Sequence, residues 1–135
     1  MQKISAQSKG VFVIAATPFL PSGEIDLAST DKMVDFYFEK GADGLTILGM
    51  MGEAPKLTQG EALSITKQIL KRAGNKPVVV GVSAPGLAAI GELTKAVMDE
   101  GAAGVMVAPP GSLRTNEQII GYYANVVQSV GEDVP

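Results

Sequence analysis

The chain of 135 residues is 46% hydrophobic and 19% charged, which fits one globular domain and excludes a disordered polar chain. It holds no cysteine and no histidine, so disulfide frameworks, thiolate or imidazole metal sites and histidine-based catalytic triads are excluded. The net charge is −3 and the 11 basic residues are scattered along the chain, which offers no surface for nucleic acid.

The N-terminal residues do not have the pattern of a targeting segment. Residues 1–10 carry two lysines but no apolar stretch, unlike a secretory signal, and no apolar run approaches the ~18 residues of a membrane span. We therefore expect a cytoplasmic protein without membrane, nucleic-acid, metal or cofactor partners. Residues 1–9 are predicted to be a short N-terminal extension of one domain that spans residues 1–135.

Four short apolar runs are predicted to be β-strands. They are continuously apolar rather than alternating, which is typical of parallel strands that are covered on both faces. No linker rich in glycine and proline divides them into two domains. In chain order the runs are 11–16, 45–48, 78–82 and 105–108.

An amphipathic stretch with helical spacing follows each run. Two of these helices are predicted to begin with a capping box, Thr58 with Glu61 and Thr115 with Gln118. Glycines that suit a helix C-cap follow the four stretches, at positions 41, 74, 101 and 131. The apolar stripes are, in turn, Met33, Val34 and Tyr37; Ala62, Ile65, Thr66 and Ile69; Ile90, Leu93, Val97 and Met98; and Ile119, Tyr123, Val126, Val127 and Val130.

The chain contains an internal repeat. Residues 39–45 recur in similar form as residues 99–105, 60 positions later, which is twice the ~30 residues of one strand-plus-helix unit. The resulting βαβαβαβα string suits a small open doubly wound sheet or one half of a barrel that needs about 250 residues. Regular unit lengths favour the first four units of a (β/α)8 barrel, with parallel strands in the order 1-2-3-4. A contact between the first and third strands would instead favour the open sheet.

Several short blocks occur together in a characteristic order and spacing, at residues 16–19, 23–26, 41–44, 49–53 with 57–58, 77–82 and 101–109. With these blocks the chain resembles the N-terminal half of the dihydrodipicolinate synthase/N-acetylneuraminate lyase family, the pyruvate-dependent class I aldolases. The resemblance covers residues 10 to 135, nearly the whole chain.

The resemblance implies a TIM barrel in which a lysine on the sixth strand forms a Schiff base with a 2-oxo acid, usually pyruvate. The imine is an electron sink that makes a carbanion accessible. Since the chain ends where a fifth strand would begin, we expect no catalytic residue within it and no activity from it alone. No predicted strand contains a lysine. Lys56 lies on a loop at the carboxyl ends of the strands, and we interpret it as a surface lysine.

The loop after the second strand, residues 49–53, is the main candidate for substrate binding. The family usually has Gly-Thr-Thr-Gly-Glu here, and its amides and one threonine hydroxyl hold the substrate carboxylate while the other threonine joins a proton relay. This chain has methionine at both threonine positions, so backbone donors remain and hydroxyls do not. We predict substrate contacts from Gly49, Met50, Met51 and Gly52, with methionine side chains that fill apolar space. Glu53 is expected to order the loop by accepting N–H bonds.

Thr17, after the first strand, is the fifth predicted substrate-binding residue. Ser83 and Arg114 are weaker candidates. Ser83 is expected to be structural, and Arg114 is expected to be an exposed residue at a helix start. After the fourth strand the family often has Pro-Tyr-Tyr, whereas this chain reads Pro-Pro-Gly at 109–111, and Tyr122 and Tyr123 lie on a helix.

With both relay groups missing, a dihydrodipicolinate synthase reaction proper is not expected. Another 2-oxo-acid lyase, a dehydratase or a catalytically retired paralogue fits better. Two alternatives stay open: a non-catalytic half-barrel that associates with itself, as a homo-oligomer, through its open sheet edges, and a small open α/β ligand-binding module.

Overall fold

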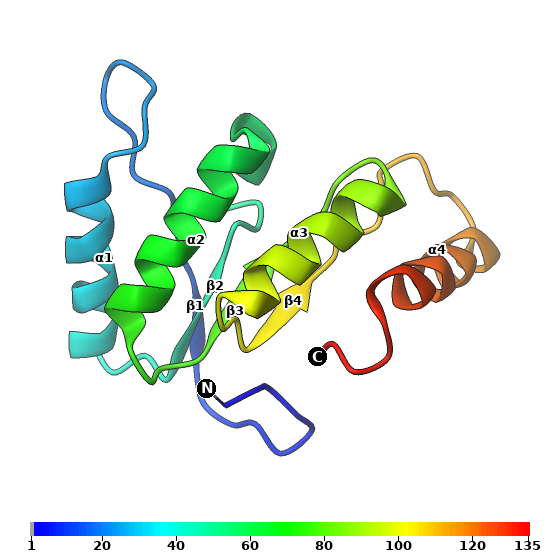
Figure 1. Ribbon diagram of the computed structural model, residues 1–135, viewed down its shortest axis with the longest axis horizontal. Coiled ribbons are helices and arrows are strands. Elements are labelled where there is room, and N and C mark those ends of the chain that lie inside the picture. Colours follow the sequence, from blue (N-terminus) through cyan, green and yellow to red (C-terminus); the bar gives the residue numbers. More distant parts are fainter. Residues whose placement is uncertain (1) are drawn as a thin grey trace.

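A computed structural model describes residues 2–135 (Figure 1). Its four parallel strands form one sheet in the order β1-β2-β3-β4, as predicted for a barrel. The open doubly wound module is wrong, because the first strand pairs with the second and not with the third. The elements are β1 (Phe12–Ile14), α1 (Leu27–Glu39), β2 (Gly44–Ile47), η1 (Ala54–Lys56), α2 (Gln59–Ala73), β3 (Val78–Gly81), α3 (Leu87–Asp99), β4 (Gly104–Met106) and α4 (Asn116–Val130).

Both predicted capping boxes are confirmed. The Thr58 hydroxyl accepts from the Glu61 N–H at 3.1 Å, and the Glu61 carboxylate accepts from the Thr58 N–H at 2.8 Å. Thr115 and Gln118 exchange the equivalent bonds at the start of α4. These contacts satisfy amide groups that have no partner within the first helical turn.

One face of the sheet packs against the helices and forms the core. Figure 1 shows α1, α2 and α3 lying side by side over the sheet, with α4 next to α3. The strand side chains that point toward the helices alternate along each strand and are buried: Leu45, Ile47, Val78, Val80 and Val82. They meet the predicted helical stripes, of which the most buried members are Val34, Ile65, Ile69, Ile90 and Val97.

The opposite face of the sheet, which we call the open face, carries Phe12, Ile14, Thr46, Val79 and Met106. Ile14 is 54% exposed and Met106 is 36% exposed. The expectation that both faces are covered is therefore met only in part: Val79 is buried beside residues 4–10, whereas Ile14 and Met106 remain open among the described residues. The strands are apolar on both sides because the open face is the inner wall of a barrel, of which these are the first four βα units.

The two ends of the described chain meet beside β4. The Ile4 N–H donates to the Ala103 carbonyl at 2.8 Å, and the Val105 N–H donates to the Pro135 carbonyl at 2.9 Å. Gly104 allows this approach, since a Cβ there would lie within 3.0 Å of the Ile4 side chain and of the Pro135 carbonyl. Treating residues 1–9 as an extension outside the repeating units stays a prediction, and Met1 lies outside the described residues.

Helix α4 buries less of its stripe than the other helices. It packs against α3, and Val126 is buried, but Val127 is 45% exposed and its neighbour on the helix surface, Ile120, is 70% exposed. The prediction that Val127 belongs to the buried stripe is therefore wrong. The apolar residues of α4 cover a wider part of its surface than its contact with α3 buries.

Candidate functional site

The carboxyl ends of the four parallel strands meet at one edge of the sheet, and the segments that follow them form what we call the mouth. These segments are residues 15–18, 48–53, 82–85 and 107–110. In a barrel of this kind the loops at this edge carry the chemistry. All five predicted substrate-binding residues lie in the mouth.

The longest mouth segment, residues 48–53, crosses the open face. Leu48 and Glu53 both have left-handed backbone angles, with φ of 57° and 53°, which costs non-glycine residues roughly 1 kcal/mol or more each. The Glu53 N–H donates to the Met50 carbonyl at 3.0 Å and closes the turn between them. Such strain persists only where the surrounding contacts hold the segment.

Gly81 and Met106 show where the first part of this loop, Leu48 and Gly49, lies. The Leu48 carbonyl occupies the place where a Cβ on Gly81 would be. A Cβ on Gly49 would lie 3.0 Å from the terminal methyl of Met106. The first part of the loop therefore lies over β3, and Gly49 lies next to the Met106 side chain of β4. Sequence analysis missed Met106, although its position two residues after Gly104 places it on the open face.

Thr17 holds the second part of the loop, at Gly52. Its side chain is buried, and its hydroxyl donates to the Gly52 carbonyl at 2.6 Å. Gly52 is buried as well, and a Cβ there would lie 2.9 Å from the Leu48 nitrogen. The structure thus brings Thr17 and the glycine loop together, but the donor hydrogen of the Thr17 hydroxyl is engaged with the loop itself.

The loop offers a group of backbone donors. Among the hydrogen bonds of residues 2–135, the amides of Gly49, Met50, Met51 and Gly52 have no protein acceptor. Successive backbone amides in a tight turn make a favourable place for an anion. The donors predicted for a carboxylate are therefore present and unused.

The side chains at the tip of the loop point away from the protein interior. Met50 is 91% exposed and Met51 is 62% exposed, so the expectation that they fill apolar space is wrong for this chain. The expectation for Glu53 is also wrong, because its carboxylate pairs with the Lys56 ammonium at 2.5 Å rather than accepting backbone N–H bonds. Lys56 is exposed, as expected.

The remaining polar candidates serve the scaffold. The Ser83 hydroxyl accepts from the Ala108 N–H at 2.8 Å and ties the ends of β3 and β4 together. The Tyr123 hydroxyl donates to the Val107 carbonyl at 2.8 Å. The Tyr122 hydroxyl is buried without a partner among the described residues, and burial raises the pKa of this phenol. Both tyrosines thus belong to the packing of α4, and Arg114 is exposed.

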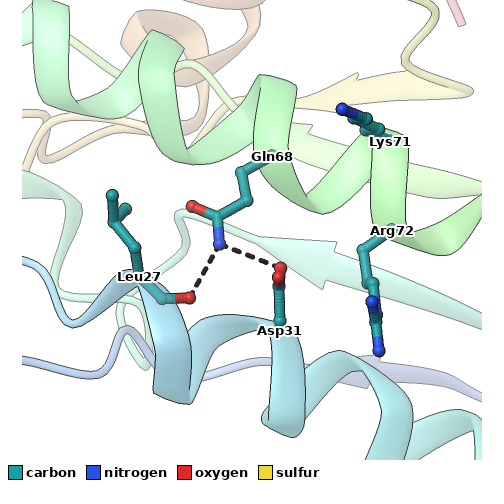
Figure 2. A pocket seen from close by; sticks show the side chains of 5 residues that line it. All are labelled: Leu27, Asp31, Gln68, Lys71 and Arg72. Atoms are coloured by element: carbon teal, nitrogen blue, oxygen red, sulfur yellow. Dashed lines mark hydrogen bonds between the residues drawn. The ribbon is translucent and has the colours of Figure 1, made fainter.

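A hollow of about 600 Å³ lies elsewhere, between α1 and α2 on the outer surface (Figure 2). The Gln68 side-chain amide crosses it to donate to the Leu27 carbonyl at 2.7 Å and to the Asp31 carboxylate at 2.9 Å. Arg72 binds Asp35 through its Nε at 2.7 Å, which lowers the pKa of that carboxyl. Apart from Lys71, the polar side chains that line this hollow are bound to protein groups, and the hollow lies on the helices rather than at the strand ends.

Within residues 2–135, no three His, Cys, Asp or Glu side chains gather as a metal site would require. In the same part of the chain, no helix combines the length and apolar character needed to cross a membrane.

Comparison with known proteins gives a consistent result. The sequence model of the dihydrodipicolinate synthetase family matches residues 7–134. A 4-hydroxy-tetrahydrodipicolinate synthase of Coxiella burnetii is 32% identical over 123 residues, covering 90% of this chain and 43% of the relative. An L-2-keto-3-deoxyarabonate dehydratase of Azospirillum brasilense is 35% identical over 127 residues, covering 90% of this chain and 41% of the relative.

Solved structures agree with this match. A crystal structure of dihydrodipicolinate synthase from Rhodopseudomonas palustris has a TM-score of 0.95 and 50% sequence identity, covering all of this chain and 45% of its own length. The chain thus spans less than half the length of the relatives that it matches. The matched residues and the strand order together show that the chain belongs to the dihydrodipicolinate synthetase family.

Proposed function

We propose that this chain is the N-terminal part of a Schiff-base-forming lyase or dehydratase that acts on a 2-oxo acid of the pyruvate type. The observation that carries the proposal is the group of four amides, Gly49 to Gly52, without a protein acceptor at the strand ends. They are held in place by the Thr17 hydroxyl on the Gly52 carbonyl. A substrate carboxylate is the group that such donors suit.

We propose further that the 135 residues do not catalyse this reaction alone. A Schiff base needs an amine that is uncharged at working pH, which a lysine becomes through desolvation or a neighbouring cation. All nine lysines of the chain are exposed and none lies in a strand. Lys56, the lysine nearest the mouth in the sequence, is exposed and pairs with the Glu53 carboxylate.

The missing hydroxyls argue for a reaction other than that of dihydrodipicolinate synthase. Methionine occupies positions 50 and 51, and residues 109–111 contain no tyrosine. Tyr122 and Tyr123 belong to the packing of α4 and are not replacements. The similarity to a relative named L-2-keto-3-deoxyarabonate dehydratase supports a reaction other than that of dihydrodipicolinate synthase.

Trapping with borohydride tests the proposal. The lysine amine attacks the oxo carbon of pyruvate, water leaves, and borohydride delivers hydride to the imine carbon to give a stable secondary amine. We expect an intact protein that includes the sixth strand to gain one reduced pyruvyl group by mass spectrometry, and the 135-residue chain to gain none. An adduct on the chain, above all at Lys56, or no adduct on the folded longer protein, would overturn the proposal.

A second candidate function is self-association without catalysis. The exposed Ile14 and Met106 of the open face favour it, because two copies can cover these faces by closing an eight-stranded ring. Light scattering on the pure chain tests this: a dimer is expected, and a folded monomer contradicts it. We also propose that the intact protein acts in the cytoplasm as a homo-oligomer.

A further inference from the structure

We infer that Met50 and Met51 are a site of oxidative modification, at which peroxide forms methionine sulfoxide and thereby weakens the binding of a substrate carboxylate to the loop of residues 48–53. The position of the site concerns the chain itself. The effect on binding rests on the proposed function, because it adds a means of regulation to the proposed binding group. Both follow from where the structure places the thioether groups of the chain.

Thioethers are the side chains of this protein on which a peroxide acts most readily. The sequence has six methionines and no cysteine, histidine or tryptophan. No thiol therefore competes for the oxidant, and methionine sulfoxide, which reductases convert back to methionine, is the expected product. Since all the thioethers have the same chemistry, their exposure to solvent decides which of them reacts first.

The methionines differ strongly in exposure. Met50 and Met51, at the tip of the loop, are 91% and 62% exposed. Met106, on the open face beside the loop, is 36% exposed. Met33 and Met98 are partly buried and pack against the core from α1 and α3. The most exposed thioethers of the described residues thus gather at the loop, whereas the sheltered ones lie on the helices.

The modification needs only hydrogen peroxide as a second reactant. The thioether sulfur attacks one oxygen atom of the peroxide and the O–O bond breaks. The sulfur keeps that oxygen and is oxidised by two electrons, while the other oxygen is reduced and leaves as water. A flexible apolar side chain becomes polar and carries an oxygen that accepts hydrogen bonds.

The new oxygen forms beside donors that lack an acceptor. The amides of Gly49, Met50, Met51 and Gly52 have no protein acceptor within residues 2–135. A methionine side chain is unbranched and flexible, so its sulfoxide can fold back onto a neighbouring amide of the tip. There it competes with the substrate carboxylate for the same N–H groups. Oxidation is therefore expected to lower the affinity for the carboxylate, and reduction to restore it.

Peptide mapping of the 135-residue chain tests the position of the site. The chain is treated with hydrogen peroxide for increasing times, digested with trypsin and analysed by mass spectrometry. We expect sulfoxide first at Met50 and then at Met51, with Met50 reacting severalfold faster than Met33 and Met98. In denaturant this order should disappear, because unfolding exposes every thioether. Oxidation of Met33 or Met98 as fast as Met50 in the folded chain would overturn the inference.

Borohydride trapping of pyruvate on the intact protein tests the effect on binding. After peroxide treatment and removal of the peroxide with catalase, the pyruvate concentration for half-maximal trapping should rise severalfold, and methionine sulfoxide reductase should reverse the rise. Met50→Leu with Met51→Leu leaves no thioether at the tip, so the same treatment should not change its half-maximal concentration. Met33→Leu with Met98→Leu is the matched control and should respond as the wild type does. Each variant is compared only with its own untreated form.

The outcomes separate this inference from the proposed function. If the tip is oxidised but the half-maximal concentration stays the same, or if the double leucine variant of the tip responds as strongly as the wild type, the inference is wrong while the proposed function stands. If no pyruvate is trapped on the folded, untreated intact protein, the proposed function fails and the effect on binding fails with it. The position of the site is decided by the peptide map alone.

Discussion

The two faces of this sheet are built from similar residues but have different surroundings. On the helix-covered face, Ile47 is 2% exposed and contributes to a continuous core. On the open face, Ile14 is 54% exposed and no helix covers it. The difference teaches that the stability of the chain resides on one side of the sheet, whereas the other side and the loop that crosses it are available for binding.

Replacing one isoleucine on each face is the most direct way to test this contrast. Ile47→Ala should destabilise the 135-residue chain by about 2–5 kcal/mol, because it leaves a cavity in the core. Ile14→Ala should cost less than about 1 kcal/mol, because its side chain is half in water already. Unfolding in denaturant, followed by circular dichroism, measures both. Equal losses would mean that the open face is covered in solution.

A smaller effect is expected where the loop crosses the sheet. Gly81→Ala places a methyl group against the Leu48 carbonyl, so the loop must move, at a cost of about 1–3 kcal/mol. Gly121→Ala, in α4, has open space around its Cα and should stabilise the chain by about 0.5–1 kcal/mol. Amide chemical shifts of residues 48–53 should change in the first variant only. Unchanged shifts there would contradict the loop position.

Thr17 provides a finer test of how the loop is held. Thr17→Val keeps the shape but removes the bond to the Gly52 carbonyl, with an expected loss of about 1 kcal/mol. Thr17→Ser should retain most of it. In the intact protein the valine variant should raise KM for the 2-oxo acid more than it lowers kcat, since the loop binds the carboxylate. A loss confined to kcat would assign Thr17 a role in the chemistry instead.

The smallest expected effect is on how the unfolding free energy depends on pH. The Ser29 hydroxyl and amide bind the Asp26 carboxylate at the start of α1 and lower its pKa in the folded chain. A lowered folded pKa adds stability above the unfolded value near 4, and this stability is lost as the pH falls through the folded value. Asp26→Asn keeps a capping side chain but does not titrate. Its unfolding free energy should fall less than that of the wild type between pH 7 and pH 3; an equal fall would contradict the prediction.

Sequence analysis predicted the features that depend on local pattern. The capping boxes at Thr58 and Thr115, the buried stripe of α2 and the order of the strands are confirmed. A helix stripe or a cap involves residues a few positions apart, so it is visible in any short window. The predictions for Glu53 and for the methionine side chains were wrong, because they depended on what surrounds the loop in space.

The sequence by itself determined the repeating units, the family and the loss of two hydroxyls from the glycine loop, since these lie in residue identities and short spacings. Only the tertiary structure decided which groups of the mouth remain available. Thr17 meets Gly52 across 35 positions, and Ser83 meets Ala108 across 25. Such partners are chosen by the packing of parallel strands and their loops, and that packing leaves backbone amides and methionines as the groups at the strand ends.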